Sequence, residues 1–149
     1  MNKNFSCAVL LMVGALVLSS PALAHHGDAG RYVEEVIVVK GTVLQVQMLN
    51  PHSMIVFEAE EPDGKKVRWQ AEMGAPQALM RDFGWTKETL KTGDKITLTG
   101  RRPKSGAPYL NLTERANIVV ADSGKEIYRT ENFGKPAPPK SDKGSFIAQ

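Results

Sequence analysis

Hydrophobic and polar residues alternate with the two-residue period of β-strands over most of this chain. The longest such run is rich in β-branched residues and extends from Glu34 to Leu49. A strand whose buried face changes part-way needs a bend or a bulge, and Gly41 lies close to such a change. We therefore predict one long, bent strand here. Before the change the apolar residues occupy odd-numbered positions, and after it they occupy even-numbered positions. They are Ile37, Val39 and Val43, and then Leu44, Val46 and Met48.

Shorter alternating runs predict further strands along the chain. Between the third and fourth strands, apolar residues recur at helical spacing after Pro76 and before Gly84, which suit the first turn and the end of a short helix. The predicted later strands lie at residues 55–60, 67–73, 96–99 and 110–120, with a last short run at 127–128.

Three strands, a helix and two more strands follow one another in the order of an OB-type Greek-key barrel. A closed barrel also removes the exposed edges that so many β-branched strands would otherwise present. The predicted fold class is therefore mainly β: an OB-like Greek-key barrel of five to six strands, with one short helix between strands 3 and 4.

The first 24 residues have the features of a secretory signal peptide. Lys3 precedes an apolar run from Ala8 to Leu18, and Ala22-Leu23-Ala24 forms an A-x-A cleavage site. We expect export to the periplasm, and no apolar stretch of about 18 residues follows that would span a membrane after cleavage. An uncleaved signal anchor is the alternative. The predicted organisation is a signal peptide at 1–24, a mobile leader at 25–33, the barrel at 34–133 and a disordered tail at 134–149.

Composition excludes several classes of function. The one cysteine, Cys7, lies inside the signal peptide, so the mature chain would contain no disulfide and no thiolate ligand. Net charge is only +3, aromatic residues make up 7% of the chain, and no basic block stands out, so we expect no nucleic-acid partner. No catalytic triad or pair of carboxylates is recognisable, and we do not expect an enzyme.

Cleavage after Ala24 would create a mature terminus that begins with His25 and His26. The freed α-amino group has an ordinary pKa of about 7.7–8.0. Together with an imidazole it could chelate copper, nickel or zinc, all of which accept imidazole ligands. A solvated leader that merely suits the signal peptidase is the alternative.

The third histidine of the chain, His52, follows Asn50 and Pro51 where the first strand should end. OB-type barrels meet ligands in such loops, so these three residues, with Trp85, form a candidate ligand loop. A turn histidine that caps the backbone is the alternative for His52. Additional candidate metal ligands are Met48, Met54, Asp28 and Glu72.

A strand advances by about 3.3 Å per residue, so the predicted strand should carry His52 away from His25. Only a leader folded back along the barrel, or a site shared between two chains, would then join them. Both tryptophans, Trp69 and Trp85, are expected to anchor the core. Farther on, four residues suggest a small basic ligand surface, with a solvated hairpin as the alternative: Arg101, Arg102, Lys104 and Tyr109.

Several short motifs, in order, make the chain resemble a family of small exported bacterial proteins of unknown function. The resemblance spans roughly residues 24–120 and implies an exported β-barrel-like domain without an established reaction. The motifs are Ala24-His25-His26, Gly41-Thr42-Val43, Asn50-Pro51-His52, Glu72-Met73-Gly74-Ala75-Pro76, Gly84-Trp85 and the stretch from Leu90 to Gly100.

The sequence thus predicts a small periplasmic binding module. Its binding end is expected to contain the His52 loop, with His25 and His26 as conditional partners. The leading ligand is copper or another divalent metal, bound through the N-terminal histidines. A metal-free adaptor that binds a small molecule or an envelope protein through its barrel loops is the main alternative. An oxidative enzyme with a terminal-histidine copper site is a third hypothesis.

Overall fold

The computed structural model describes residues 30–137. The predicted signal peptide, His25, His26, Asp28 and most of the predicted tail lie outside these residues. The elements in chain order are β1 (Tyr32–Gln47), β2 (Met54–Glu60), β3 (Lys66–Glu72), α2 (Pro76–Phe83), β4 (Lys95–Pro103), β5 (Tyr109–Asn111), β6 (Asn117–Val120) and β7 (Glu126–Arg129).

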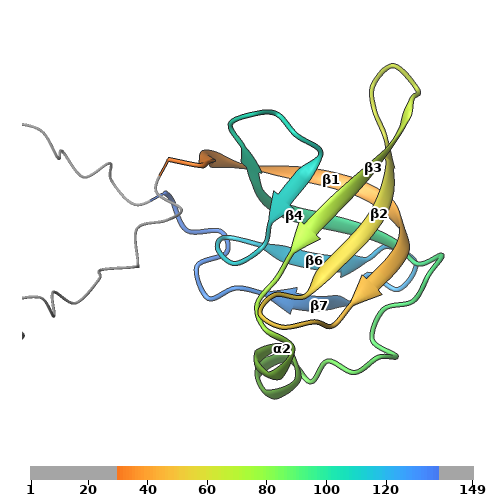
Figure 1. Cartoon of the computed structure of the whole chain (residues 1–149), viewed down its shortest axis with the longest axis vertical. Coiled ribbons are helices and arrows are strands. Elements are labelled where there is room, and N and C mark those ends of the chain that lie inside the picture. Colours follow the sequence, from red (N-terminus) through yellow and green to blue (C-terminus); the bar gives the residue numbers. More distant parts are fainter. Residues whose placement is uncertain (1–29, 138–149) are drawn as a thin grey trace, which may run out of the picture.

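Five strands close into a mixed β-barrel, and one short helix connects β3 to β4 (Figure 1). The ring runs β1-β2-β3-β5-β4 and closes because β1 also pairs with β4. β3 and β5 are parallel, and the other pairs in the ring are antiparallel. This arrangement confirms the predicted fold class.

The bend of β1 allows one strand to close the ring. From Val36 to Thr42 the strand pairs with β4, and from Thr42 to Gln47 it pairs with β2. Gly41 lies at this crossover, where a Cβ atom would come within 2.5 Å of the Glu58 carbonyl oxygen. The predicted irregularity close to Gly41 is confirmed: the pairing of β1 with β2 shifts register between Val43 and Gln45. β1 begins two residues earlier than the predicted strand because Tyr32 pairs with Pro103 and is only 3% exposed.

The predicted strand over 110–120 is interrupted. Its first part, β5, pairs with β4 at Arg101, and its second part, β6, resumes pairing two residues away at Thr99. The intervening segment leaves the ladder, and Arg115 within it takes a left-handed backbone conformation (φ 49°). β6 pairs with β4, and β7 pairs with β6 in an antiparallel hairpin, so these two strands extend the sheet beyond the five-strand ring.

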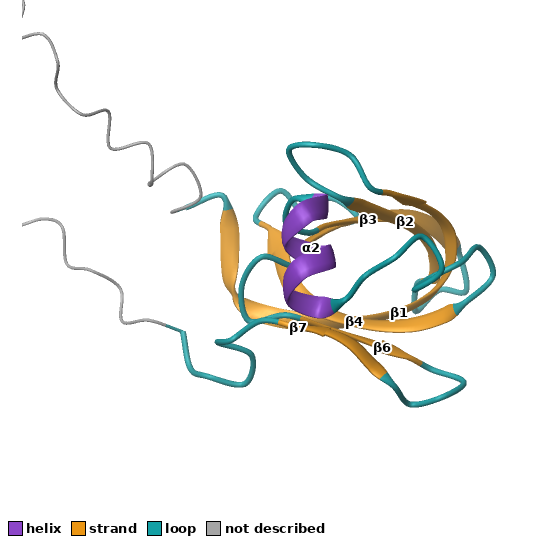
Figure 2. Ribbon diagram, turned by 90° about the horizontal axis from the view of Figure 1, so that it is seen from below, coloured by secondary structure: helices purple, strands orange, loops and turns teal. Residues whose placement is uncertain are grey.

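The helix α2 lies across one open end of the barrel (Figure 2). Its C-cap, Gly84, has φ 65°, and Leu79 packs into the core. Trp85 follows the cap at 1% exposure, and its Nε1–H donates to the carbonyl of Ile127 at 2.8 Å. Trp69 is 4% exposed, so both tryptophans anchor the core as predicted.

Among residues 30–137, no helix combines the length and apolar character needed to cross a membrane.

Candidate functional site

His52 lies in the loop between β1 and β2 and contacts a carboxylate at the end of β3. Its Nδ1 atom is 2.5 Å from Oε1 of Glu72. The loop is held beside β3 by two backbone bonds: Ser53 N–H donates to Gly74 O at 3.1 Å, and Met73 N–H donates to Ser53 O at 2.9 Å. The pairing of β2 with β3 therefore determines which carboxylate His52 meets.

The two side chains of this pair differ in exposure. The Glu72 side chain is 16% exposed, whereas the His52 side chain is 53% exposed. In a neutral imidazole, the nitrogen that faces a carboxylate carries the ring proton, so in that form Nδ1 is the donor and Nε2 has the free lone pair. The carboxylate thus selects the tautomer and orients the ring, and the imidazole is the part that solvent reaches.

Tyr109, the first residue of β5, contacts the other oxygen of the same carboxylate. Its hydroxyl donates to Oε2 of Glu72. Burial raises the pKa of Tyr109, and the hydrogen bond and the charge of Glu72 raise this pKa further, with smaller contributions from Tyr32. Tyr109 therefore remains a neutral donor. Both oxygens of Glu72 are engaged, which fits an orienting carboxylate better than the free oxygen ligand considered from sequence.

These contacts connect His52 to the beginning of β1. His52 contacts Glu72, Glu72 accepts from Tyr109, and Tyr109 and Tyr32 line the same cavity. The expectation that His25 meets His52 only if the leader folds back along the barrel stays a prediction, because His25 lies outside the described residues. Because β1 bends and the barrel closes, the strand begins near the contacts that hold the His52 loop. His25 lies seven residues before Tyr32, a length of chain that can reach about 23–25 Å.

The other residues of the predicted ligand loop have different environments. Asn50 and Pro51 are exposed beside His52. Trp85 is a correction: its indole lies in the core and is bonded to Ile127, so it does not line an open pocket. Met48 is partly buried and packs against the core.

The predicted basic surface does not exist as a single surface. Neighbouring residues on a strand point to opposite faces. The Arg101 guanidinium accordingly lies 5.4 Å from the centre of the Tyr32 ring, whereas that of Arg102 lies 5.1 Å from the Trp69 ring. Arg102 also donates to the carbonyls of Gly106 and Ala107 and so secures the turn after β4.

A cavity of about 340 Å³ lies beside Tyr32 and Tyr109. It is bounded by the beginning of β1 and by the turn between β4 and β5. No sequence motif indicated it, because its walls come from segments about 70 residues apart that meet only when β1 pairs with the end of β4. The residues around it are Arg31, Tyr32, Pro103, Ser105, Ala107 and Tyr109.

Within residues 30–137, no three His, Cys, Asp or Glu side chains are grouped in a way that could hold a metal ion. Of the histidines and carboxylates considered as metal ligands, His52 and Glu72 lie in the described residues and contact each other. His25 and His26 lie outside it.

Tyrosine ionisation tests the geometry of this region. Burial raises the pKa of Tyr128 to about 12, and the pKa of Tyr109 is also raised. Because both folded-state values exceed the unfolded value of about 10, the stabilising contributions of both tyrosines are complete below pH 10, and that of Tyr128 is lost as pH rises through about 12. We expect a phenolate absorbance titration to show a step near pH 12 that Tyr128→Phe removes. We also expect Glu72→Gln to lower the pKa of Tyr109. A Tyr109 pKa that Glu72→Gln leaves unchanged would contradict the contact.

Comparison with known proteins gives a family but no activity. No curated protein matches the chain. The family match extends from within the predicted signal peptide to the first residue of β5, and it spans His25, His26, His52 and Glu72. The chain belongs to a family of unknown function (DUF6152), whose model matches residues 14–109.

Proposed function

We propose that this protein is an exported, periplasmic binding module for copper or another divalent metal, with His25, His26 and His52 as ligands. The signal-type segment at 1–24 supports export. The observation that carries the metal proposal is the contact between His52 Nδ1 and Glu72 at 2.5 Å.

A histidine that binds a metal commonly donates its other ring N–H to a carboxylate. Glu72 supplies that carboxylate for His52, and Tyr109 holds Glu72 in turn. The arrangement leaves Nε2 of a half-exposed imidazole as the ligating nitrogen. One imidazole is a weak site by itself, so further ligands are needed.

The mature N-terminus offers those ligands. Its α-amine and the imidazole of His25 would form a chelate, and the chain between His25 and Tyr32 would span about 23–25 Å when extended toward His52. Imidazole and amine nitrogens suit copper, nickel and zinc. Since only the deprotonated nitrogens ligate, affinity should fall as the solution is acidified.

The first test concerns Glu72. Changing Glu72 to Gln should weaken Cu(II) binding about 10–100-fold, because loss of an outer-shell carboxylate releases the ring orientation and lowers ligand basicity. The measurement is a Cu(II) titration against a competing chelator, on mature protein whose N-terminal residue has been verified by intact mass. The matched control is Glu60→Gln, at an exposed position at the end of β2, which should leave affinity unchanged.

The second test asks whether the two ends of the site are joined. His52→Ala should reduce affinity to that of the N-terminal chelate alone, and an extra residue before His25 should remove the chelate. If His52→Ala binds Cu(II) as tightly as the unaltered protein, the shared site is wrong and the leader binds alone. Binding no tighter than that of a free His-His peptide would refute the metal function.

The cavity beside Tyr32 favours a second candidate, a metal-free module for a small acidic molecule. Its volume of about 340 Å³ lies within the range of small-ligand sites, and Arg31 supplies a cation at its edge. Binding of small carboxylates, followed by ligand-observed NMR with a metal chelator present, should be lost in Arg31→Gln if this function is correct.

A further inference from the structure

Two arginines outside the proposed metal site have almost fully buried side chains. Arg101 lies near the end of β4, and Arg115 lies in the segment that interrupts the strand between β5 and β6. Their side chains are 9% and 8% exposed. Burying a guanidinium is costly unless it is paired and hydrogen-bonded, so the partners of both groups matter.

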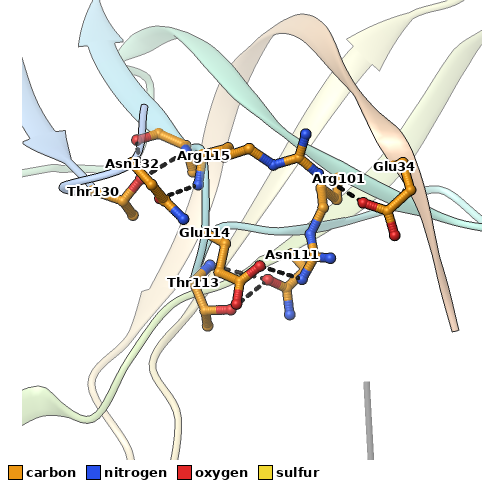
Figure 3. Close-up of polar contacts among 9 residues, drawn as sticks. Glu34, Arg101, Asn111, Thr113, Glu114, Arg115, Thr130 and Asn132 are labelled. Carbon is orange, nitrogen blue, oxygen red and sulfur yellow. Dashed lines mark hydrogen bonds and ion pairs between the residues drawn. The ribbon is translucent and has the colours of Figure 1, made fainter. Parts of the chain in front are cut away.

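Each guanidinium meets one carboxylate (Figure 3). Nη2 of Arg101 is 3.2 Å from Glu114, and Nη2 of Arg115 is 3.3 Å from Glu34. Strong charge-assisted bonds measure about 2.7–2.9 Å, so both pairs are loose. The two carboxylate side chains are also 53% and 49% exposed. The anions are therefore the solvated members of these pairs.

The two arginines have more hydrogen-bond donors than these carboxylates use. A guanidinium has five N–H donors in a fixed fork. The Nε atoms of Arg101 and Arg115 are buried and have no hydrogen-bond partner among residues 30–137. Such a fork matches the two oxygens of a carboxylate or phosphate group.

The segment that presents Arg115 is held rigidly. Arg115 has φ 49°, a conformation that is unfavourable for a non-glycine residue and persists only where the surroundings impose it. Its N–H donates to Oδ1 of Asn132 at 2.7 Å, and the next N–H, of Ala116, donates to Oγ1 of Thr130 at 2.9 Å. At the other end, Oδ1 of Asn111 accepts from Thr113 (Figure 3).

We propose that Arg101 and Arg115 form a binding site for an oxyanion, the carboxylate or phosphate group of a small ligand. Glu34 and Glu114 act as internal competitors for the same donors. Their exposure allows them to turn into solvent when a ligand with several oxygens binds. The site uses none of the proposed metal ligands and stands whether or not the protein binds a metal.

The test is a titration of the mature protein with inorganic phosphate, and separately with acetate, followed by NMR at constant ionic strength. Constant ionic strength separates specific binding from charge screening. Saturable shifts should appear at the amides of residues 113–116, and the tighter of the two anions identifies the ligand group. Arg115→Gln should raise Kd at least tenfold. The control Arg68→Gln, at an exposed position on β3, should not change Kd.

The glutamate variants provide the sharper result. Glu114→Gln removes an internal competitor and should lower Kd several-fold. Because it alters a half-exposed side chain, this variant tests the proposal even if Arg115→Gln does not fold. No saturable shift in either the unaltered protein or Glu114→Gln would overturn the proposal, as would equal weakening by Arg68→Gln and Arg115→Gln. The cluster would then be a purely structural pair of ion pairs.

Discussion

Replacing Trp85 with alanine is expected to lower the free energy of unfolding by about 3–5 kcal/mol. The indole is 1% exposed and belongs to the core. Trp85 directly follows the C-cap of α2, the helix that lies across one open end of the barrel. Loss of the indole would leave a large cavity and would also remove the donor to the Ile127 carbonyl. Small domains are stable by only about 5–15 kcal/mol, so the variant should be close to unfolding at ordinary temperature. Urea denaturation followed by circular dichroism would measure the change.

Two comparison variants separate the causes of that loss. Trp85→Phe keeps an aromatic ring in the core but leaves the Ile127 carbonyl unpaired, which should cost about 1–3 kcal/mol. Met80→Ala changes an α2 side chain that is 58% exposed and should alter stability by no more than about 0.5 kcal/mol. If Trp85→Ala unfolds at the same urea concentration as Met80→Ala, the indole does not hold this end of the barrel together.

Replacing Gly41 with alanine should produce the second large effect, a loss of about 1–3 kcal/mol or more. The added Cβ would lie 2.5 Å from the Glu58 carbonyl oxygen and 2.6 Å from Cδ2 of Phe57. The carbonyl oxygen belongs to the backbone of β2, so relief requires β1 and β2 to separate where the barrel closes. Thermal and urea unfolding would report the loss of stability.

Gly74→Ala is the matched control for this prediction. A Cβ at Gly74 meets no atom within 4 Å, and its backbone is not in the left-handed region. The change should therefore be neutral within about 0.5 kcal/mol, or slightly stabilising through the unfolded chain. Equal stability of Gly41→Ala and Gly74→Ala would show that β1 does not need a close approach at its bend.

The alternating pattern was sufficient for the fold because burial is repeated at every second residue of a strand. It predicted the bend near Gly41, whereas helical spacing between Pro76 and Gly84 predicted the helix after the third strand. The two core tryptophans were also expected. The alternating pattern missed the break within 110–120. Between the pairs formed with Arg101 and Thr99, β4 advances two residues while the other strand advances six, from Asn111 to Asn117. The other strand therefore contains an even number of extra residues. Apolar residues before and after the break still fall on alternate positions of the same series, so the alternating pattern shows no break.

The candidate site was predictable only residue by residue. His52 was suggested by its loop, and Glu72 was named as a possible oxygen ligand, but no sequence signal linked Glu72 to His52. The pairing of Met54 with Glu72 brings them together, and that register is not a local property of either strand. Arg101 and Arg102 could have been assigned to opposite faces from strand alternation alone. Arg115 could not, because its partner, Glu34, lies 81 positions away.

The sequence by itself determined the strand order, the closed mainly-β architecture and the residues capable of chemistry, because these follow from local periodicity and side-chain type. Only the tertiary structure decided which of those residues meet. Closing the ring brought the beginning of β1 to Tyr109, assigned Glu72 to His52 and buried Arg101 and Arg115 beside exposed carboxylates. Such contacts depend on register and curvature summed over the whole barrel, which no short stretch of sequence contains.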